Sequence, residues 1–105
     1  MPESGYTNAM PVRAKKELPA PATLALLSLA HIAGDEALFA RFFALSGLDQ
    51  ASLKSRAGEP AVLGGVLDFV LGDERLVLSL AESFDVPPEA FARARRKLPG
   101  AVLES

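Results

Sequence analysis

The feature of this chain that most constrains its fold is a five-residue motif that occurs twice, 38 residues apart. Gly-Asp-Glu-Ala-Leu at residues 34–38 returns as Gly-Asp-Glu-Arg-Leu at residues 72–76. Apolar residues on both sides of the motif recur at the same offset, as the pairs Leu24/Val62, Leu29/Leu67, Ile32/Val70, Leu48/Val86 and Leu53/Phe91. An apolar framework that repeats at one fixed offset indicates a single supersecondary unit used twice.

Each unit has the pattern of three short helices separated by capping residues. Aspartate is expected to begin helices, because its carboxylate accepts hydrogen bonds from the free N–H groups of a first helical turn. Glycine past a helix end can take the left-handed conformation, and Gly34 is able to do so just past the first predicted helix. The six predicted helices are residues 22–33, the stretch from Asp35 to Gly47, the stretch from Asp49 to Ala57, residues 60–71, the stretch that Asp73 caps, and the stretch between Pro87-Pro88 and Pro99-Gly100.

The predicted fold is an all-α, compact bundle of about six short helices, arranged as two three-helix repeats. Residues 1–20 are expected to form a disordered tail, residues 21–100 the helical domain, and residues 101–105 a frayed end. Two units are fewer than an open solenoid normally needs, so they should pack on each other, with a homodimer interface as added support. The second helix is expected to bury one face, made of Leu38, Phe39, Phe42, Phe43 and Leu45.

Composition excludes several classes of function. Half of the residues are apolar, but the chain has no cysteine and one histidine, His31, so thiolate or His-rich metal sites and thiol nucleophiles are not expected. No glycine-rich phosphate loop or serine nucleophile elbow is present. We therefore expect no enzyme activity and no cofactor. The absence of cysteine suits a cytoplasmic protein, and no apolar run approaches the ~20 residues that span a membrane.

The repeated Gly-Asp-Glu permits two interpretations. Two Asp-Glu pairs brought together could bind a divalent cation or supply an acid and a base. Alternatively, glycine ends one helix and aspartate caps the next, while Glu36 and Glu74 lie near the positive end of the helix dipole. Both copies stand where a cap is needed, which favours the second interpretation.

The fourth predicted helix carries a stripe of small residues. Gly64 and Gly65 lie in its interior, although each glycine costs about 1 kcal/mol there relative to alanine. On a helical wheel they share one face with Asp68, opposite the large apolar residues. The stripe either packs tightly against a neighbouring helix of the same domain or forms a groove for a helix or extended segment of a partner.

Two basic features are candidates for nucleic-acid binding. Residues 44–56 have some features of a helix-turn-helix, in which Gln50, Ser52 and Lys54 would face bases. Phe43, Ser46 and Asp49 depart from that pattern. The last helix ends in a basic patch that could hold phosphates or form a solvated face matched to the helix dipole, made of Arg93, Arg95, Arg96 and Lys97.

Three stretches carry a resemblance to a known family: Ser-Gly-Leu-Asp at 46–49, Val-Leu-Asp-Phe-Val-Leu-Gly-Asp-Glu at 66–74, and Leu-Pro-Gly at 98–100. With these, residues 24–100 resemble small, chiefly alphaproteobacterial helical proteins grouped as a domain of unknown function. The resemblance implies a compact cytoplasmic helical domain with no assigned activity, cofactor or catalytic residue. Where family members tend to show a second Gly-Leu turn, this chain has Asp85 and Val86.

The leading hypothesis is a non-catalytic protein-interaction module that binds an unidentified protein through the Gly64/Gly65/Asp68 stripe. Nucleic-acid binding, through the helix-turn-helix-like segment or the basic patch, is the alternative. The net charge of −2 gives no general attraction to nucleic acid or to an anionic membrane.

Overall fold

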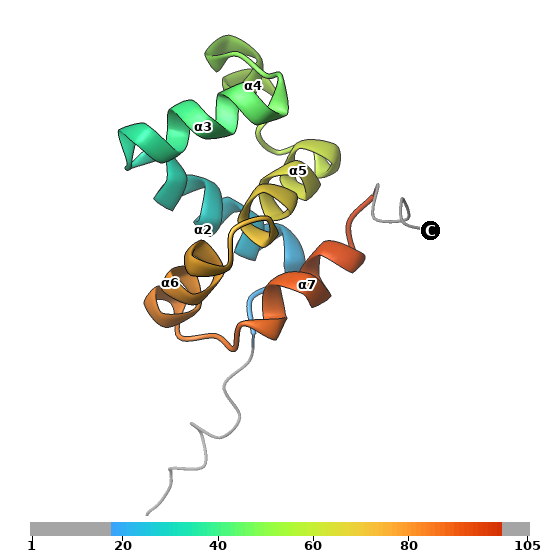
Figure 1. Cartoon of the computed structure of the whole chain (residues 1–105). Helices are drawn as coiled ribbons and strands as arrows, with labels where there is room; N and C mark the ends of the chain where they lie inside the picture. The colour runs from blue at the N-terminus through green and yellow to red at the C-terminus, as the bar shows by residue number, and fades with distance from the viewer. Residues whose placement is uncertain (1–17, 100–105) are drawn as a thin grey trace, which may run out of the picture.

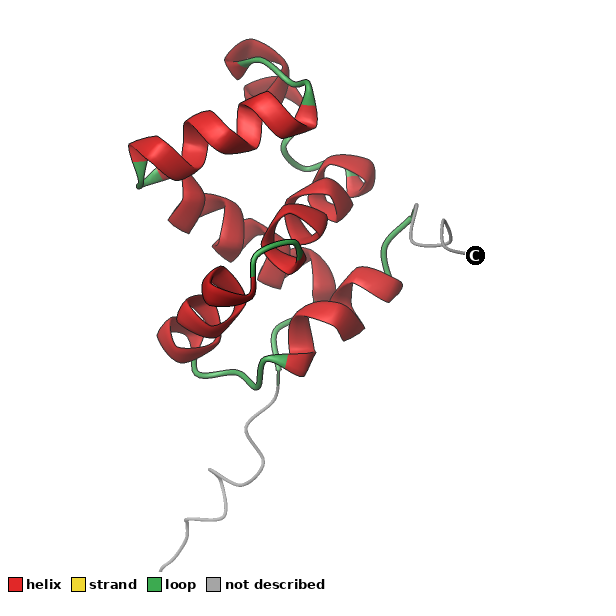
Figure 2. Cartoon of the chain, in the orientation of Figure 1, coloured by secondary structure: helices red, strands yellow, loops and turns green. Residues whose placement is uncertain are grey.

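The computed structural model describes residues 18–99, which fold into a compact bundle of α-helices without a strand (Figure 1 and Figure 2). The expected tail therefore falls mostly outside the described residues, and the frayed end falls wholly outside them. The all-α prediction is confirmed. The six helices of the described part are α2 (Pro21–Ala33), α3 (Glu36–Ser46), α4 (Gln50–Arg56), α5 (Pro60–Leu71), α6 (Glu74–Phe84) and α7 (Glu89–Arg96).

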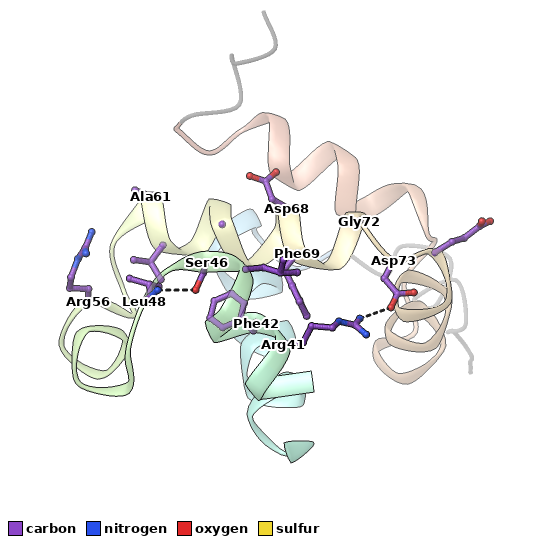
Figure 3. Close-up of a pocket in the computed structure, with 14 residues that line it drawn as sticks. Arg41, Phe42, Ser46, Leu48, Arg56, Ala61, Asp68, Phe69, Gly72 and Asp73 are labelled. Atoms are coloured by element: carbon purple, nitrogen blue, oxygen red, sulfur yellow. Dashed lines mark hydrogen bonds and ion pairs between the residues drawn. The ribbon is translucent and has the colours of Figure 1, made fainter. Parts of the chain in front are cut away.

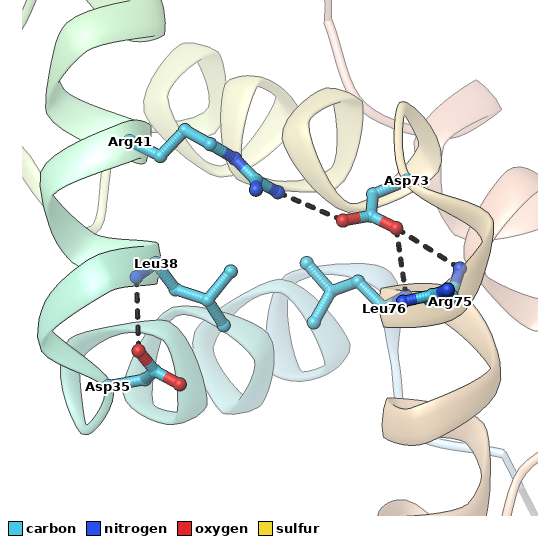
Figure 4. Close-up of polar contacts among 6 residues, drawn as sticks. All are labelled: Asp35, Leu38, Arg41, Asp73, Arg75 and Leu76. Atoms are coloured by element: carbon cyan, nitrogen blue, oxygen red, sulfur yellow. Dashed lines mark hydrogen bonds and ion pairs between the residues drawn. The ribbon is translucent and has the colours of Figure 1, made fainter.

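Three aspartates begin helices, as the sequence predicts. The Asp35 carboxylate accepts a hydrogen bond from the Leu38 N–H at 3.1 Å, and Asp49 accepts one from the Ser52 N–H at 2.7 Å. Asp73 accepts from two N–H groups, those of Arg75 and Leu76 (Figure 4). These bonds satisfy donors that a helix N-terminus otherwise leaves without a partner.

Gly34 ends α2, as predicted, without using the left-handed conformation that is open to glycine. Gly34 has φ −82° and continues in the right-handed region, because its N–H still bonds back to the carbonyls of α2 and Asp35 follows at once as the next cap. Gly47 takes the left-handed conformation, with φ 77°, and ends α3. Asp85, 38 residues later, takes it with φ 58° and ends α6.

Helix α5 is the centre of the bundle. Four helices pack on it, namely α2, α3, α6 and α7, and Figure 1 shows it crossing the middle of the molecule. Its side chains are accordingly buried on most sides, including Val66, Leu67 and Val70. Helix α7 lies on both α5 and α2 and contributes the fully buried Phe91, whereas α4 lies at the periphery.

The residues that match at the 38-residue offset are nearly all buried. Of the five pairs, only Leu48 is less than fully enclosed, and it still packs against the core. The surroundings of the last helix of each unit differ, however, since α7 packs on two helices and α4 packs closely on none. The arrangement as two equivalent repeats stays a prediction.

One predicted core residue of α3 is on the surface. Phe42 is buried and Leu38, Phe39 and Phe43 pack partly against the core, but the Leu45 side chain is 72% exposed. The burial of Leu45 was predicted wrongly, because α3 and α5 leave an open groove between them at this position and no helix covers the side chain.

The apolar helices are short. None of those described is by itself long and apolar enough to cross a membrane. Helices α2 and α3 together reach the required length and composition, but the chain bends by 119° between them.

Candidate functional site

An open groove of about 780 Å³ lies between α3 and α5 (Figure 3). Arg56, at the end of α4, lies at one end of the groove, and Asp73, which caps α6, lies at the other. A groove of this size, with an apolar floor and a few polar groups at its margins, is typical of binding sites.

The floor of the groove is aromatic and apolar. Phe42 of α3 meets Phe69 of α5 edge to face, with ring centroids 5.4 Å apart and an interplanar angle of 83°. Leu45 lies at the margin on α3 and is the most exposed of the large apolar side chains described. The groove is therefore a place where apolar surface remains in contact with water.

The two adjacent glycines of α5 face different surroundings. Gly65 lines the groove, and a Cβ added there would meet nothing within 4 Å. A Cβ on Gly64 would lie 2.9 Å from Nη1 of Arg95 and 3.2 Å from the Pro99 carbonyl oxygen. Gly64 is thus packed within the domain, as the first interpretation of the stripe expects, whereas Gly65 is open to the groove. That the groove receives a partner stays a prediction.

Asp68 joins the groove to α7. Its two carboxylate oxygens accept from Nε and Nη2 of Arg95, at 2.7 and 3.1 Å. Nη1 of Arg95 donates to the carbonyls of Leu98 and Pro99, which follow the end of α7. The Arg95 side chain is only 11% exposed, whereas that of Asp68 is 59% exposed. Arg95 is thus committed to contacts within the chain, and Asp68 stands at the margin of the groove.

A second ion pair bridges α3 and the start of α6. Nη2 of Arg41 donates to the Asp73 carboxylate at 2.9 Å, and the Arg41 guanidinium lies 5.5 Å from the centroid of the Phe69 ring (Figure 4). The Leu76 N–H, followed by Arg41, lowers the pKa of Asp73 below its ordinary value of 3.8. The same carboxylate thus caps α6 and fixes one end of the groove.

The residues predicted to contact nucleic acid lie on two separate elements. Gln50 and Lys54 of α4 line a smaller groove of about 360 Å³ against α2, and the Ser52 N–H is used by the Asp49 cap. Bonds from the Ser52 N–H and hydroxyl lower the pKa of Asp49 below 3.8. On α7 and just after it, the exposed members of the basic patch are Arg93, Arg96 and Lys97.

The described residues do not form a cluster of metal-ligating side chains. Within residues 18–99, no three His, Asp or Glu side chains converge closely enough to hold a metal ion. His31 is exposed in the last turn of α2. The repeated Gly-Asp-Glu is used for capping, since Asp35 and Asp73 each accept N–H groups of the helix that follows.

Reasoning from sequence found one side of the groove and missed the other. Gly65 and Asp68 were identified on α5, but Arg41, Leu45 and Phe69 were not assigned to a site. The sequence did contain a signal for Leu45. It lies four residues after Arg41, so both side chains stand on the same face of α3, and a charged residue on that face indicates contact with solvent. The sequence contained no such signal for Phe69, because an aromatic residue in an apolar helix is equally consistent with a place in the hydrophobic core.

Comparison with known proteins identifies the family of this chain. A family model described as a protein of unknown function, DUF3572, matches residues 12–101. The chain therefore belongs to that family, in agreement with the resemblance seen in the sequence. Comparisons with curated proteins and with solved structures find no match.

Proposed function

For this member of the DUF3572 family, we propose a non-catalytic role as a protein-interaction module whose docking surface is the groove between α3 and α5. The groove receives a helical segment of another polypeptide. One observation carries the proposal: Leu45 stands 72% exposed at the margin of an apolar groove whose opposite wall is opened by Gly65.

The dimensions and chemistry of the groove suit a helix. An α-helix with its side chains is about 10–12 Å wide, and it binds by placing apolar residues at positions i, i+3, i+4 and i+7 into such a surface. Ala61 and Gly65 keep the α5 wall low, so a backbone can approach closely. Phe42 and Phe69 offer the apolar floor.

Nucleic-acid binding is less well supported. Arg95 is the central cation of the predicted basic patch. Its guanidinium already donates hydrogen bonds to Asp68 and to two backbone carbonyls. Helix α4, the reading helix of the helix-turn-helix hypothesis, has seven residues and buries Leu53 alone. Residues 21–92 carry more acidic than basic side chains, so the body of the domain would also repel a long polyanion.

The proposal also includes the source and the cellular compartment of the protein. A bacterial, cytoplasmic protein is supported by the family resemblance and by the lack of cysteine, which suits a reducing compartment. Neither a metal nor a cofactor takes part in the proposed docking.

The test is site-specific photo-crosslinking in cells of the source organism. The full chain carries p-benzoylphenylalanine in place of Ala61, which lines the groove, or in place of Ala37, an exposed residue of α3 outside the groove. We expect a discrete adduct from position 61, none from position 37, and loss of the adduct when Gly65→Leu fills the groove. An adduct that survives Gly65→Leu, or that forms equally at both positions, would contradict the proposal.

A further inference from the structure

We propose that the segment received by the groove is the α3 edge of a second copy of this chain, an inference that rests on the proposed function. The two copies face each other about a two-fold axis. Leu45 of each copy enters the groove of the other and lies over Gly65. Because the same surface is used on both copies, such a contact closes as a dimer and does not extend into a filament.

The charges of the groove are self-complementary. The wall formed by α3 and the end of α4 carries Arg41 and Arg56, whereas the wall formed by α5 and the start of α6 carries Asp68, Asp73 and Glu74. When the first wall of one copy meets the second wall of the other, basic residues face acidic ones on both sides of the axis. This arrangement favours a second copy over an unrelated apolar helix and fixes its register.

The shapes of the walls are complementary in the same sense. The α3 wall projects, since Leu45 is the most exposed large apolar side chain described. The α5 wall is hollow at Gly65, where a Cβ would meet nothing within 4 Å. Insertion of Leu45 into that hollow removes apolar surface from water in both copies at once. It also covers the apolar floor formed by Phe42 and Phe69.

The existing ion pairs do not prevent this contact. Asp68 keeps its bonds to Arg95, but its side chain is 59% exposed and still faces the groove. In Arg41–Asp73 and Arg56–Glu59 the two arginine side chains are 50% and 45% accessible. Exposed pairs contribute little to stability, so their arginines can turn to new partners across an interface at low cost. Glu74 has no ion pair among the described residues and is exposed at the groove.

The experiment is sedimentation equilibrium of the full chain, with two variants matched in chemistry. Leu45→Asp places a charge at the proposed contact, and Leu78→Asp places the same charge on an exposed leucine of α6 outside the groove. We expect the wild type and Leu78→Asp to dimerise alike, and Leu45→Asp to raise the dimer dissociation constant at least tenfold. Circular dichroism checks that both variants keep their helices.

A mixing experiment tests the direct contact between positions 45 and 65. Leu45→Asp and Gly65→Lys should each be monomeric alone, whereas their mixture should form a 1:1 heterodimer. In that heterodimer one contact is native, and in the other the introduced carboxylate at position 45 of one variant meets the introduced amine at position 65 of the other. A mixture that stays monomeric would contradict the proposed register, as would a Leu45→Asp variant that dimerises like the wild type.

Failure of this inference can be told apart from failure of the proposed function. A wild-type chain that stays monomeric at high concentration overturns the second copy as occupant. If the same chain still gives a Gly65-dependent adduct with a different protein from position 61, the groove retains its proposed role. An adduct with twice the mass of the chain supports the dimer.

Discussion

At the scale of single residues, the two adjacent glycines of α5 are present for different reasons. Gly64 leaves room for the Arg95 guanidinium and for the Pro99 carbonyl, so the space that a side chain would take is already filled. Gly65 leaves an open hollow in the groove, and no contact within the described part of the domain requires a glycine there. Under the proposed function, the missing side chain at Gly65 leaves room for the docked segment, at the expense of helix propensity.

Alanine substitution should separate the two glycines. Gly65→Ala is expected to stabilise the fold by about 0.5–1 kcal/mol, because alanine has the better helix propensity and its Cβ meets nothing. Gly64→Ala is expected to lose that gain or to destabilise, since the Cβ displaces Arg95 from Asp68. Urea denaturation of both variants measures the difference. Equal gains at both positions would show that Arg95 gives way without cost.

Residue patterns identified the buried side chains of most helices but not the exposed face of α3. Phe42 and Leu45 stand three positions apart and look alike as core residues in the sequence. Only the packing of α3 against α5 decides the difference: Phe42 meets Phe69 and is covered, whereas Leu45 stands at the open groove between the two helices. Gly65 and Asp68 could be found from sequence, since small and charged residues are unusual in a central helix. Arg41 and Phe69 could not.

At the scale of helices and turns, a few residues that can be recognised in the sequence determine where each helix begins and ends. The boundaries of the helices agree closely with prediction, because aspartate caps and helix-ending glycines act locally. Asp85 shows the limit of such rules. It adopts the left-handed conformation that glycine adopts at position 47, although the sequence offers no glycine there.

The left-handed turn after α3 predicts a specific cost. Gly47→Ala should destabilise the fold by about 1–2 kcal/mol, because φ 77° brings the Cβ of an ordinary residue close to the backbone. Gly58→Ala is the matched control, since Gly58 is exposed, lies outside that region of φ, and has open space around it. Thermal unfolding of both variants gives the comparison. A Gly47→Ala protein as stable as the control would contradict this account.

The cap of α6 predicts part of the acid sensitivity of the fold. The Asp73 pKa is lowered in the folded state by the Leu76 N–H and then by Arg41, so the folded state favours the ionised carboxylate. Its contribution to stability is therefore present above the ordinary pKa of 3.8 and is lost as pH falls through the lower folded value. Acidification should destabilise Asp73→Asn less than it destabilises the wild type.

The measurement for Asp73 is the urea midpoint at about pH 5 and at about pH 3, where the ordinary carboxyl pKa lies between the two conditions. Glu82→Gln, an exposed change on the same helix, is the control and should show the wild-type decrease. If the urea midpoint of Asp73→Asn decreases as much as that of this control, the Asp73 cap does not contribute to the acid sensitivity of the fold.

At the scale of the whole molecule, Arg95 connects the last helix to the central one. It donates two parallel hydrogen bonds to the Asp68 carboxylate. It also donates to the backbone carbonyl oxygens of Leu98 and Pro99. Arg95→Lys keeps the charge but loses this planar geometry, so we expect a loss of about 1–2 kcal/mol. Arg96→Lys, on the exposed side of α7, should stay within about 0.5 kcal/mol of the wild type. Urea denaturation decides, and equal stabilities would contradict the role of Arg95.

The packing of the helices against one another was the aspect of the fold that could be predicted least from the sequence. The repeat suggested equivalent places for α4 and α7, but α7 lies across α5 and α2 while α4 stays at the edge. Their apolar content explains the difference: α4 buries Leu53 alone, whereas α7 buries Ala90, Phe91 and Ala94. Local rules fix each helix, but the competition among helices for the central one depends on all of them together.

The position of α7 has a consequence for how the chain acquires its structure as it is made. The first helix described, α2, packs on α7 as well as on α3 and α5, so part of its apolar face stays uncovered until α7 has been synthesised. Until Phe91 emerges, a nascent chain presents an unfilled core to chaperones and proteases. The domain therefore completes its core only once α7 has been made, and quality control of the nascent chain acts before that point on an open intermediate.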